Sequence, residues 1–114
     1  MAIMAWRRLS EEHVSRSIYL LTFEGKRVYV GQSVKPDRRI KAHRRQWPEP
    51  FTPLVVTTLV TDELGILDLE YAWRWRAHLS GWNVINLEGL MFDLSLIKES
   101  ARRQGERLTW PFFT

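Results

Sequence analysis

The chain has 114 residues, of which 45% are hydrophobic and 26% are charged, and none is cysteine. This length predicts one domain, and this composition excludes a disordered chain, a disulfide framework and a zinc site built on thiolates. Charged residues come too early for a signal peptide, and no apolar run is long enough to span a membrane. We therefore expect a soluble cytoplasmic protein, associated with the nucleoid in a bacterium or nuclear in a eukaryote.

The charged side chains are unevenly distributed along the chain. The formal net charge of +4 and the pI near 9.9 favour nucleic acid as a partner only weakly. Basic side chains gather between residues 26 and 45, whereas residues 62–70 are acidic. A basic surface with an acidic point inside it suits a phosphate substrate and a metal ion, although two ordinary solvated helix faces give the same pattern.

The first half of the chain predicts a polar lead-in followed by two strands. Ser10 is expected to cap a short helix through Arg16, with Trp6 packed against the domain. Residues 18–23 and 28–31 are β-branched and aromatic runs, which is typical of buried strands. Residues 24–26 join these strands as a tight hairpin.

The length of this hairpin loop decides where the tyrosines lie, because side chains alternate between the two faces of a strand. A two-residue loop would pair Tyr29 with Leu20 and put Tyr19 on the opposite face. A three-residue loop with a bulge pairs Tyr29 with Leu21, so that both tyrosines share a face. We predict the three-residue loop, because only that register builds a joint tyrosine site.

The rest of the chain predicts helices alternating with short extended segments. Residues 31–33 are expected to form a loop, and a helix runs from Pro36 to about Gln46, with Ile40 and Trp47 turned toward the core. A proline-rich connection is expected at residues 47–53 and a strand at 54–60. A helix capped at Thr61 or Asp62 then runs to about residue 79, and a short extended run follows at 82–87. A last helix at 93–103 precedes an aromatic tail at 108–114, which either covers the core or docks a partner. The fold class is α/β of the α+β kind: a three-stranded antiparallel sheet flanked by helices, in the order β-β-α-β-α, plus a C-terminal helix.

Several segments together resemble the GIY-YIG nuclease family. SIY at residues 17–19 and YVG at 29–31 resemble the two halves of its signature, with Ser17 in place of the first glycine. Arg39 and His43 follow at the spacing that the family has. LEYAW at residues 69–73 resembles the family's glutamate helix, particularly in the structure-specific branch that cuts branched DNA, and GWN at 81–83 resembles its closing glycine-aromatic-asparagine.

The resemblance covers about residues 17–83, and it implies a single nuclease domain over residues 1–114, with a core at 17–87 and a C-terminal helical addition at 90–114. The implied activity is metal-dependent hydrolysis of DNA phosphodiester bonds, in DNA repair or recombination, on duplex or branched DNA. The chain has no recognised segment that reads DNA sequence, so a protein partner or self-association would supply specificity.

The chemistry of phosphodiester hydrolysis suits the residues that the resemblance selects. Glu70 is a hard oxygen ligand for one Mg²⁺ or Mn²⁺ ion, and Arg39 offers a planar fork of donors to the phosphate. Tyr19 would hold or deprotonate the attacking water, with Tyr29 positioning Tyr19 or the phosphate. His43 would support Tyr19 or accept a proton, and which tyrosine is the base stays open. Substrate is expected to contact Gly31, Ser33, Lys35, Arg38, Arg44 and Asn83.

Each of these residues also has an ordinary structural explanation. The tyrosines suit a strand, Arg39 and His43 suit a solvated helix face, and Glu70 suits an i,i+4 pair with Arg74. Two other functions therefore stay open. The basic helix and Ser17 suit a nucleic-acid-binding module without catalytic activity, and the aromatic tail suits a protein-interaction adaptor. An RNA target also stays open.

Overall fold

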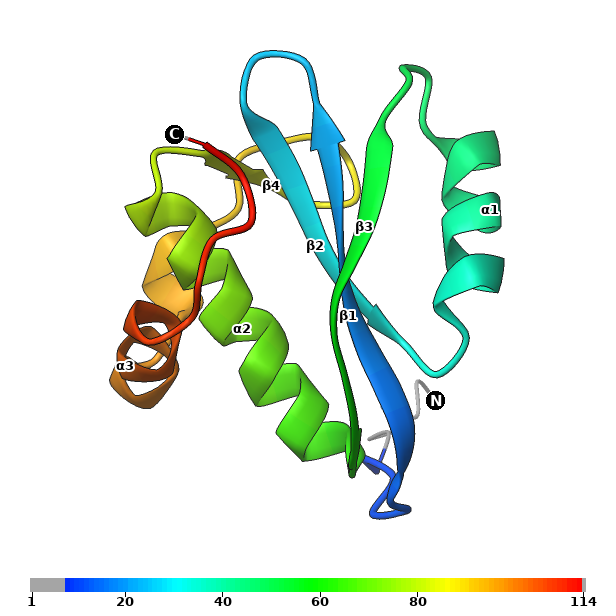
Figure 1. Cartoon of the computed structure of the whole chain (residues 1–114), viewed down its shortest axis with the longest axis vertical. Helices are drawn as coiled ribbons and strands as arrows, with labels where there is room; N and C mark the ends of the chain where they lie inside the picture. The colour runs from blue at the N-terminus through cyan, green and yellow to red at the C-terminus, as the bar shows by residue number, and fades with distance from the viewer. Residues whose placement is uncertain (1–7, 114) are drawn as a thin grey trace, which may run out of the picture.

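Four strands form one mixed sheet in the order β3-β1-β2-β4 (Figure 1). The computed structural model describes residues 8–113, so the predicted packing of Trp6 lies outside them. The strands are β1 (Val14–Phe23), β2 (Arg27–Ser33), β3 (Thr52–Thr61) and β4 (Asn83–Ile85). The helices are α1 (Pro36–Gln46), α2 (Glu63–Leu79) and α3 (Glu99–Glu106), with a 3₁₀ turn, η1 (Leu94–Leu96), before α3.

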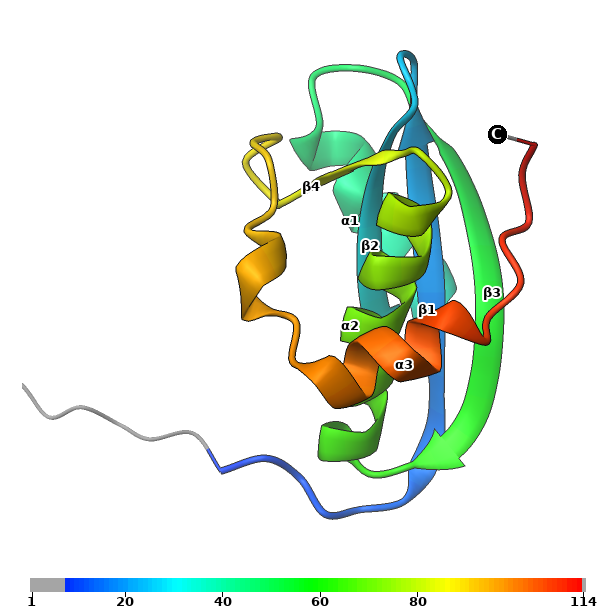
Figure 2. The same ribbon diagram turned by 90° about the vertical axis from the view of Figure 1, so that its left-hand side faces the viewer.

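The helices lie on both sides of the sheet. Helix α1 lies on one side and α2 with α3 on the other, as the two perpendicular views show (Figures 1 and 2). The α+β fold class is thus confirmed, and the predicted bounds of α1 and α2 agree with the structure. None of the helices within residues 8–113 is long and apolar enough to cross a membrane.

Each face of the sheet buries its own apolar cluster, because side chains alternate along β1 and β2. The α2 side buries Ile18 and Leu20 against Leu69 and Trp73 of the helix. The α1 side buries a more aromatic set, with Ile40 and Trp47 packed against it: Tyr19, Leu21, Phe23, Tyr29, Phe51 and Ile85. The aromatic face is therefore the one that α1 covers.

The hairpin register agrees with the prediction from loop length. Leu21 pairs with Tyr29 and Phe23 pairs with Arg27, which leaves a loop at residues 24–26. Gly25 and Lys26 adopt left-handed conformations with φ of 83° and 53°. Glycine tolerates such a φ without steric cost, so Gly25 permits the turn that puts both tyrosines on one face.

The structure corrects three predictions in the first half of the chain and the sheet. Residues 10–16 form no helix, because β1 begins at Val14 and pairs with β3 as far as Thr61. Residues 31–33 are not a loop, because β2 continues to Ser33, which pairs with Ser17. The sheet has a fourth strand, β4, which pairs with β2 in parallel. A strand of three residues is too short to show alternation in its sequence.

The C-terminal segment differs from the single helix expected at residues 93–103. The chain is extended at Ile97 and Lys98, between η1 and α3. Ile97 is buried there, and its carbonyl oxygen accepts a hydrogen bond of 2.8 Å from Arg102 Nε. In the tail, Leu108, Trp110 and Phe112 pack against the α2-side cluster, so most of the tail covers the core. Phe113 is fully exposed.

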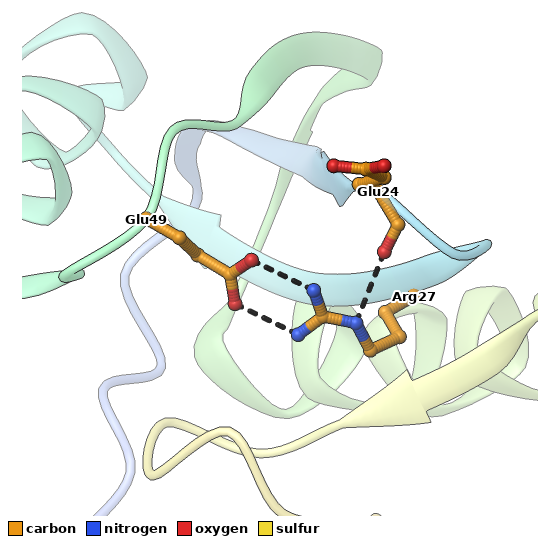
Figure 3. A network of polar contacts seen from close by, with 3 residues as sticks. All are labelled: Glu24, Arg27 and Glu49. Carbon is orange, nitrogen blue, oxygen red and sulfur yellow. Dashed lines mark hydrogen bonds and ion pairs between the residues drawn. The ribbon is translucent and has the colours of Figure 1, made fainter.

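The connection after α1 is fastened to the start of β2 by an ion pair (Figure 3). Arg27 Nη1 and Nη2 donate to the two carboxylate oxygens of Glu49 at 2.8 Å and 2.7 Å. The same guanidinium donates from Nε to the carbonyl oxygen of Glu24 in the hairpin loop. A bidentate pair of this kind fixes orientation as well as distance, so it holds residues 47–51 in place beside the aromatic face.

Candidate active site

Tyr19 and Tyr29 lie next to each other on the face of the sheet that α1 covers. Their ring centroids are 6.4 Å apart, and their exposed fractions are 1% and 8%. The Tyr19 ring lies across the backbone of Gly31. A Cβ atom added at Gly31 would be 2.5 Å from the Tyr19 hydroxyl oxygen. The absence of a side chain at Gly31 therefore makes room for the Tyr19 ring.

Helix α1 brings His43 to the two tyrosines. The Tyr19 hydroxyl and His43 Nε2 are 2.7 Å apart, and the His43 ring lies 5.3 Å from that of Tyr29. His43 is completely buried. Its second ring nitrogen, Nδ1, accepts a hydrogen bond of 3.2 Å from the indole N–H of Trp47, one turn further along the chain.

The electrostatic environment keeps these aromatic groups neutral. Burial raises the pKa of Tyr19 and of Tyr29 above the usual value near 10, while the positive charge of Arg39 partly opposes this effect. Burial, helped by repulsion from Arg39, lowers the pKa of His43 to about 4. At neutral pH, His43 is therefore an uncharged imidazole.

The positive charge of Arg39 favours the ionised form of Tyr19, so it lowers the pKa of Tyr19 against the larger effect of burial. Arg39 also lines a cavity of about 250 Å³ together with three of the residues predicted to contact substrate: Ser33, Lys35 and Arg38. Three of its lining side chains, those of Lys35, Arg38 and Arg39, are positively charged. The cavity is therefore suited to an anion such as a phosphate.

Glu70 belongs to α2, on the other side of the sheet, yet it acts on the same two tyrosines. Its negative charge contributes to the raised pKa of both Tyr19 and Tyr29. Glu70 is buried, with an exposed fraction of 8%, and its Oε1 forms an ion pair of 2.9 Å with Arg74 Nη2. Burial raises the pKa of Glu70, and the charge of Arg74 opposes this rise.

The short fourth strand explains how α2 reaches this site. Strand β4 pairs only with residues 27–29 of β2, so the edge of β2 is open from Val30 onward. Arg74 Nη2 donates to the Val30 carbonyl oxygen at that edge, at 3.3 Å. The guanidinium also lies over the rings of Tyr71 and Phe92, at 5.0 Å and 4.5 Å. Glu70 and Arg74 thus meet β2 where its backbone is uncovered.

Two residues predicted to contact substrate lie elsewhere. The Arg44 guanidinium stacks over the Phe51 ring at 4.9 Å, beside the proline-rich connection. Asn83 is exposed and pairs with Arg27 at the hairpin end of the sheet. Ser17 is buried, and its hydroxyl lies 2.8 Å from that of Thr58 on β3.

The expected i,i+4 pair of Glu70 with Arg74 is present, whereas sequence reasoning gave no role at the site to two residues that border it, Trp47 and Asn86. Asn86 lines a cavity of about 270 Å³ with Tyr29 and Arg74. Its side-chain oxygen accepts hydrogen bonds from the backbone nitrogens of Glu88 and Leu90, each at 3.0 Å. The sequence NLEG is typical of such a turn, and that signal could have located Asn86.

The described side chains at this site could supply one carboxylate ligand to a metal ion, but not a complete coordination shell. Within the described residues, no group of three or more His, Asp or Glu side chains could hold a metal ion together. Glu70 is the acidic side chain beside the tyrosines, and Arg74 engages one of its two oxygens. Mg²⁺ characteristically binds one or two carboxylates and keeps several waters, which is compatible with this arrangement.

Comparisons of the chain with protein-family models, curated proteins and solved structures found no match.

Proposed function

We propose that this chain is a metal-dependent endonuclease of the GIY-YIG type that hydrolyses phosphodiester bonds in DNA. The observation that carries the proposal is the pair of neighbouring tyrosines together with the three side chains that act on it: His43 by contact, and Arg39 and Glu70 by charge. Tyr19, Tyr29, Arg39 and His43 surround one another on the α1 face, and Glu70 acts on both tyrosines from the other side. The contact of Tyr19 with His43 and the charge effects of Arg39 and Glu70 support the proposal.

Each side chain has a role that its position supports. Arg39 binds the phosphate through its fork of donors, helped by Lys35 and Arg38 in the same cavity. Tyr19 holds the attacking water and takes its proton when ionised, which Arg39 favours and burial opposes. Tyr29 orients the water or the phosphate. A divalent ion bound at Glu70 would supply Lewis-acid stabilisation of the phosphate and leaving oxygen.

The proposed substrate is DNA, duplex or branched. The basic cavity contacts phosphate, which is the same in every sequence, so it supplies affinity but no sequence preference. Specificity then comes from the shape of the DNA, from a protein partner or from self-association. Cleavage of RNA is the alternative outcome, because no described contact distinguishes the sugar.

One observation favours a second function, nucleic-acid binding without cleavage. Glu70, the proposed metal ligand, already forms a buried ion pair with Arg74, and the positive charge of Arg74 neutralises its carboxylate. In such a module the basic cavity would bind the phosphate backbone, and binding would weaken steeply with salt. The two functions differ in one measurable respect, the appearance of nicked product.

The decisive experiment is a cleavage assay on supercoiled plasmid, branched DNA and RNA, with Mg²⁺, with Mn²⁺ and with chelator. The wild type is expected to nick DNA only with metal, and Glu70→Gln and Arg39→Ala are each expected to slow nicking by at least about 100-fold. Glu99→Gln and Arg103→Ala, on the exposed face of α3, are matched controls. Undiminished nicking in both site variants would refute the mechanism, and salt-sensitive binding without nicking would establish the second function.

A further inference from the structure

His43 is held by a different neighbour at each of its two ring nitrogens. Nε2 lies 2.7 Å from the Tyr19 hydroxyl, and Nδ1 accepts from the Trp47 indole N–H at 3.2 Å. The roles of these two contacts are not equivalent. A tyrosine hydroxyl can donate or accept a hydrogen bond, whereas an indole N–H can only donate.

This asymmetry determines which nitrogen carries the proton. A neutral imidazole has one N–H group and one bare nitrogen. Because Trp47 only donates, Nδ1 must be the bare nitrogen, and the hydrogen of His43 must lie on Nε2. The imidazolium is disfavoured as well, because it would place an N–H group on Nδ1 against the indole N–H.

We propose that Trp47 is a positioning residue that holds His43 as the Nε2–H tautomer, so that His43 donates a hydrogen bond to the Tyr19 hydroxyl oxygen. The catalytic consequence rests on the proposed nuclease function. His43 does not take a proton from Tyr19, because Nε2 already carries one. It instead stabilises negative charge on the Tyr19 oxygen, and the Tyr19 hydrogen turns away from His43.

The hydrogen bond of Trp47 is specific to its position. The other four tryptophans within residues 8–113 have buried indole N–H groups with no hydrogen-bond partner: Trp73, Trp75, Trp82 and Trp110. An indole in this protein therefore does not find a partner merely by being buried.

The surroundings of Trp47 fix the direction of its N–H group. Its ring packs against those of Phe23 and Tyr29, with centroids 4.8 Å and 6.0 Å away. Its backbone N–H caps α1 by donating to the His43 carbonyl oxygen at 2.9 Å. Two residues further on, Glu49 is held by Arg27 (Figure 3). The ring and the backbone of Trp47 are thus both held in place.

Nuclear magnetic resonance of the full chain labelled with [¹⁵N]histidine tests the tautomer directly. Long-range ¹H–¹⁵N correlations at pH 7 are expected to show His43 Nδ1 as an unprotonated nitrogen and Nε2 as a protonated one. In Trp47→Phe, which keeps the ring but not the N–H, a population with the proton on Nδ1 is expected. Wild-type His43 protonated on Nδ1, or a Trp47→Phe spectrum identical to that of the wild type, would overturn the proposal. The spectrum needs no substrate, so it is informative whether or not the chain is a nuclease.

Kinetics test the catalytic consequence. Trp47→Phe is expected to lower kcat for nicking about tenfold with little change in KM, whereas Trp110→Phe, which removes an unpartnered N–H, leaves both unchanged. His43→Gln tests the donor role without touching Trp47, because glutamine can donate to Tyr19 but has no basic nitrogen. We expect His43→Gln to retain at least ten times the activity of His43→Ala. Equal loss in the two variants would contradict the donor role, even if Trp47→Phe failed to fold.

Discussion

The protein is expected to lose about 3 kcal/mol of stability between pH 7 and pH 4 because of one buried imidazole. His43 is completely buried, and its pKa in the folded state is lowered from 6.5 to about 4. Burial is the main cause, and the positive charge of Arg39 adds to it. Tyr19, Tyr29 and Trp47 contact the imidazole, and within residues 8–113 no acidic side chain is hydrogen-bonded to it.

The sign and size of the effect follow from proton linkage. Between pH 6.5 and pH 4, the unfolded chain protonates its histidine while the folded chain does not, so the unfolded state binds more protons. Stability therefore falls as the pH falls through this window. A pKa difference of about 2.5, at 1.36 kcal/mol for each pKa unit, gives about 3 kcal/mol.

The assay is urea unfolding at several pH values, with His43→Gln as the reference. Glutamine does not titrate and can still donate to Tyr19, so every other ionisable group contributes equally to both proteins. Protonation of Glu49, whose pKa is lowered by Arg27, also reduces the stability of the protein on acidification, but it does so equally in both proteins. The difference in unfolding free energy between the two proteins is expected to shrink by about 3 kcal/mol from pH 7 to pH 4. Parallel curves would show that His43 titrates normally and would refute the reasoning.

Three further predictions test the site. Gly31→Ala is expected to destabilise the protein by about 1–3 kcal/mol in thermal unfolding, because the new Cβ collides with the Tyr19 ring, whereas Gln32→Ala, its neighbour, serves as a control with little effect. Arg74→Met is expected to cost about 3 kcal/mol by leaving Glu70 buried without its partner, and adding Glu70→Gln should recover most of this loss; a double variant as unstable as the single one would contradict the ion-pair explanation. The rate of nicking is expected to rise with pH and to show no plateau below pH ~10, because the pKa of Tyr19 is raised; a plateau near neutral pH would exclude Tyr19 as the base.

The tyrosine pair was predictable from the sequence only in part: alternation along the strands is a local rule, but two loop lengths were open, and the joint tyrosine site decided between them. The loop of residues 24–26 sets the hairpin register, and the register sets which side chains share a face. The positions of Arg39 and His43 also follow from local rules, since Pro36 begins the helix and the spacing of four puts both on one face.

The places of Asn83, Asn86 and Trp47 were not predictable, because they depend on contacts between distant segments. Asn83 was expected near the substrate, but β4 pairs in a register that places it beside Arg27, and Asn86 borders the Tyr29 cavity instead. Trp47 was expected only to fill the core. Its hydrogen bond to His43 depends on how the connection after α1 folds back, which no periodicity encodes.

Glu70 shows how one sheet can serve a site from both of its faces. A complete sheet would separate α2 from the tyrosines, because a fully paired central strand leaves no backbone uncovered. Here β4 ends opposite Tyr29, and Arg74 satisfies the exposed carbonyl of Val30. That arginine then compensates the buried charge of Glu70 beside it. A longer β4 would complete the sheet but would take the place of Arg74 at Val30, so the short strand leaves this carbonyl oxygen to the partner of Glu70.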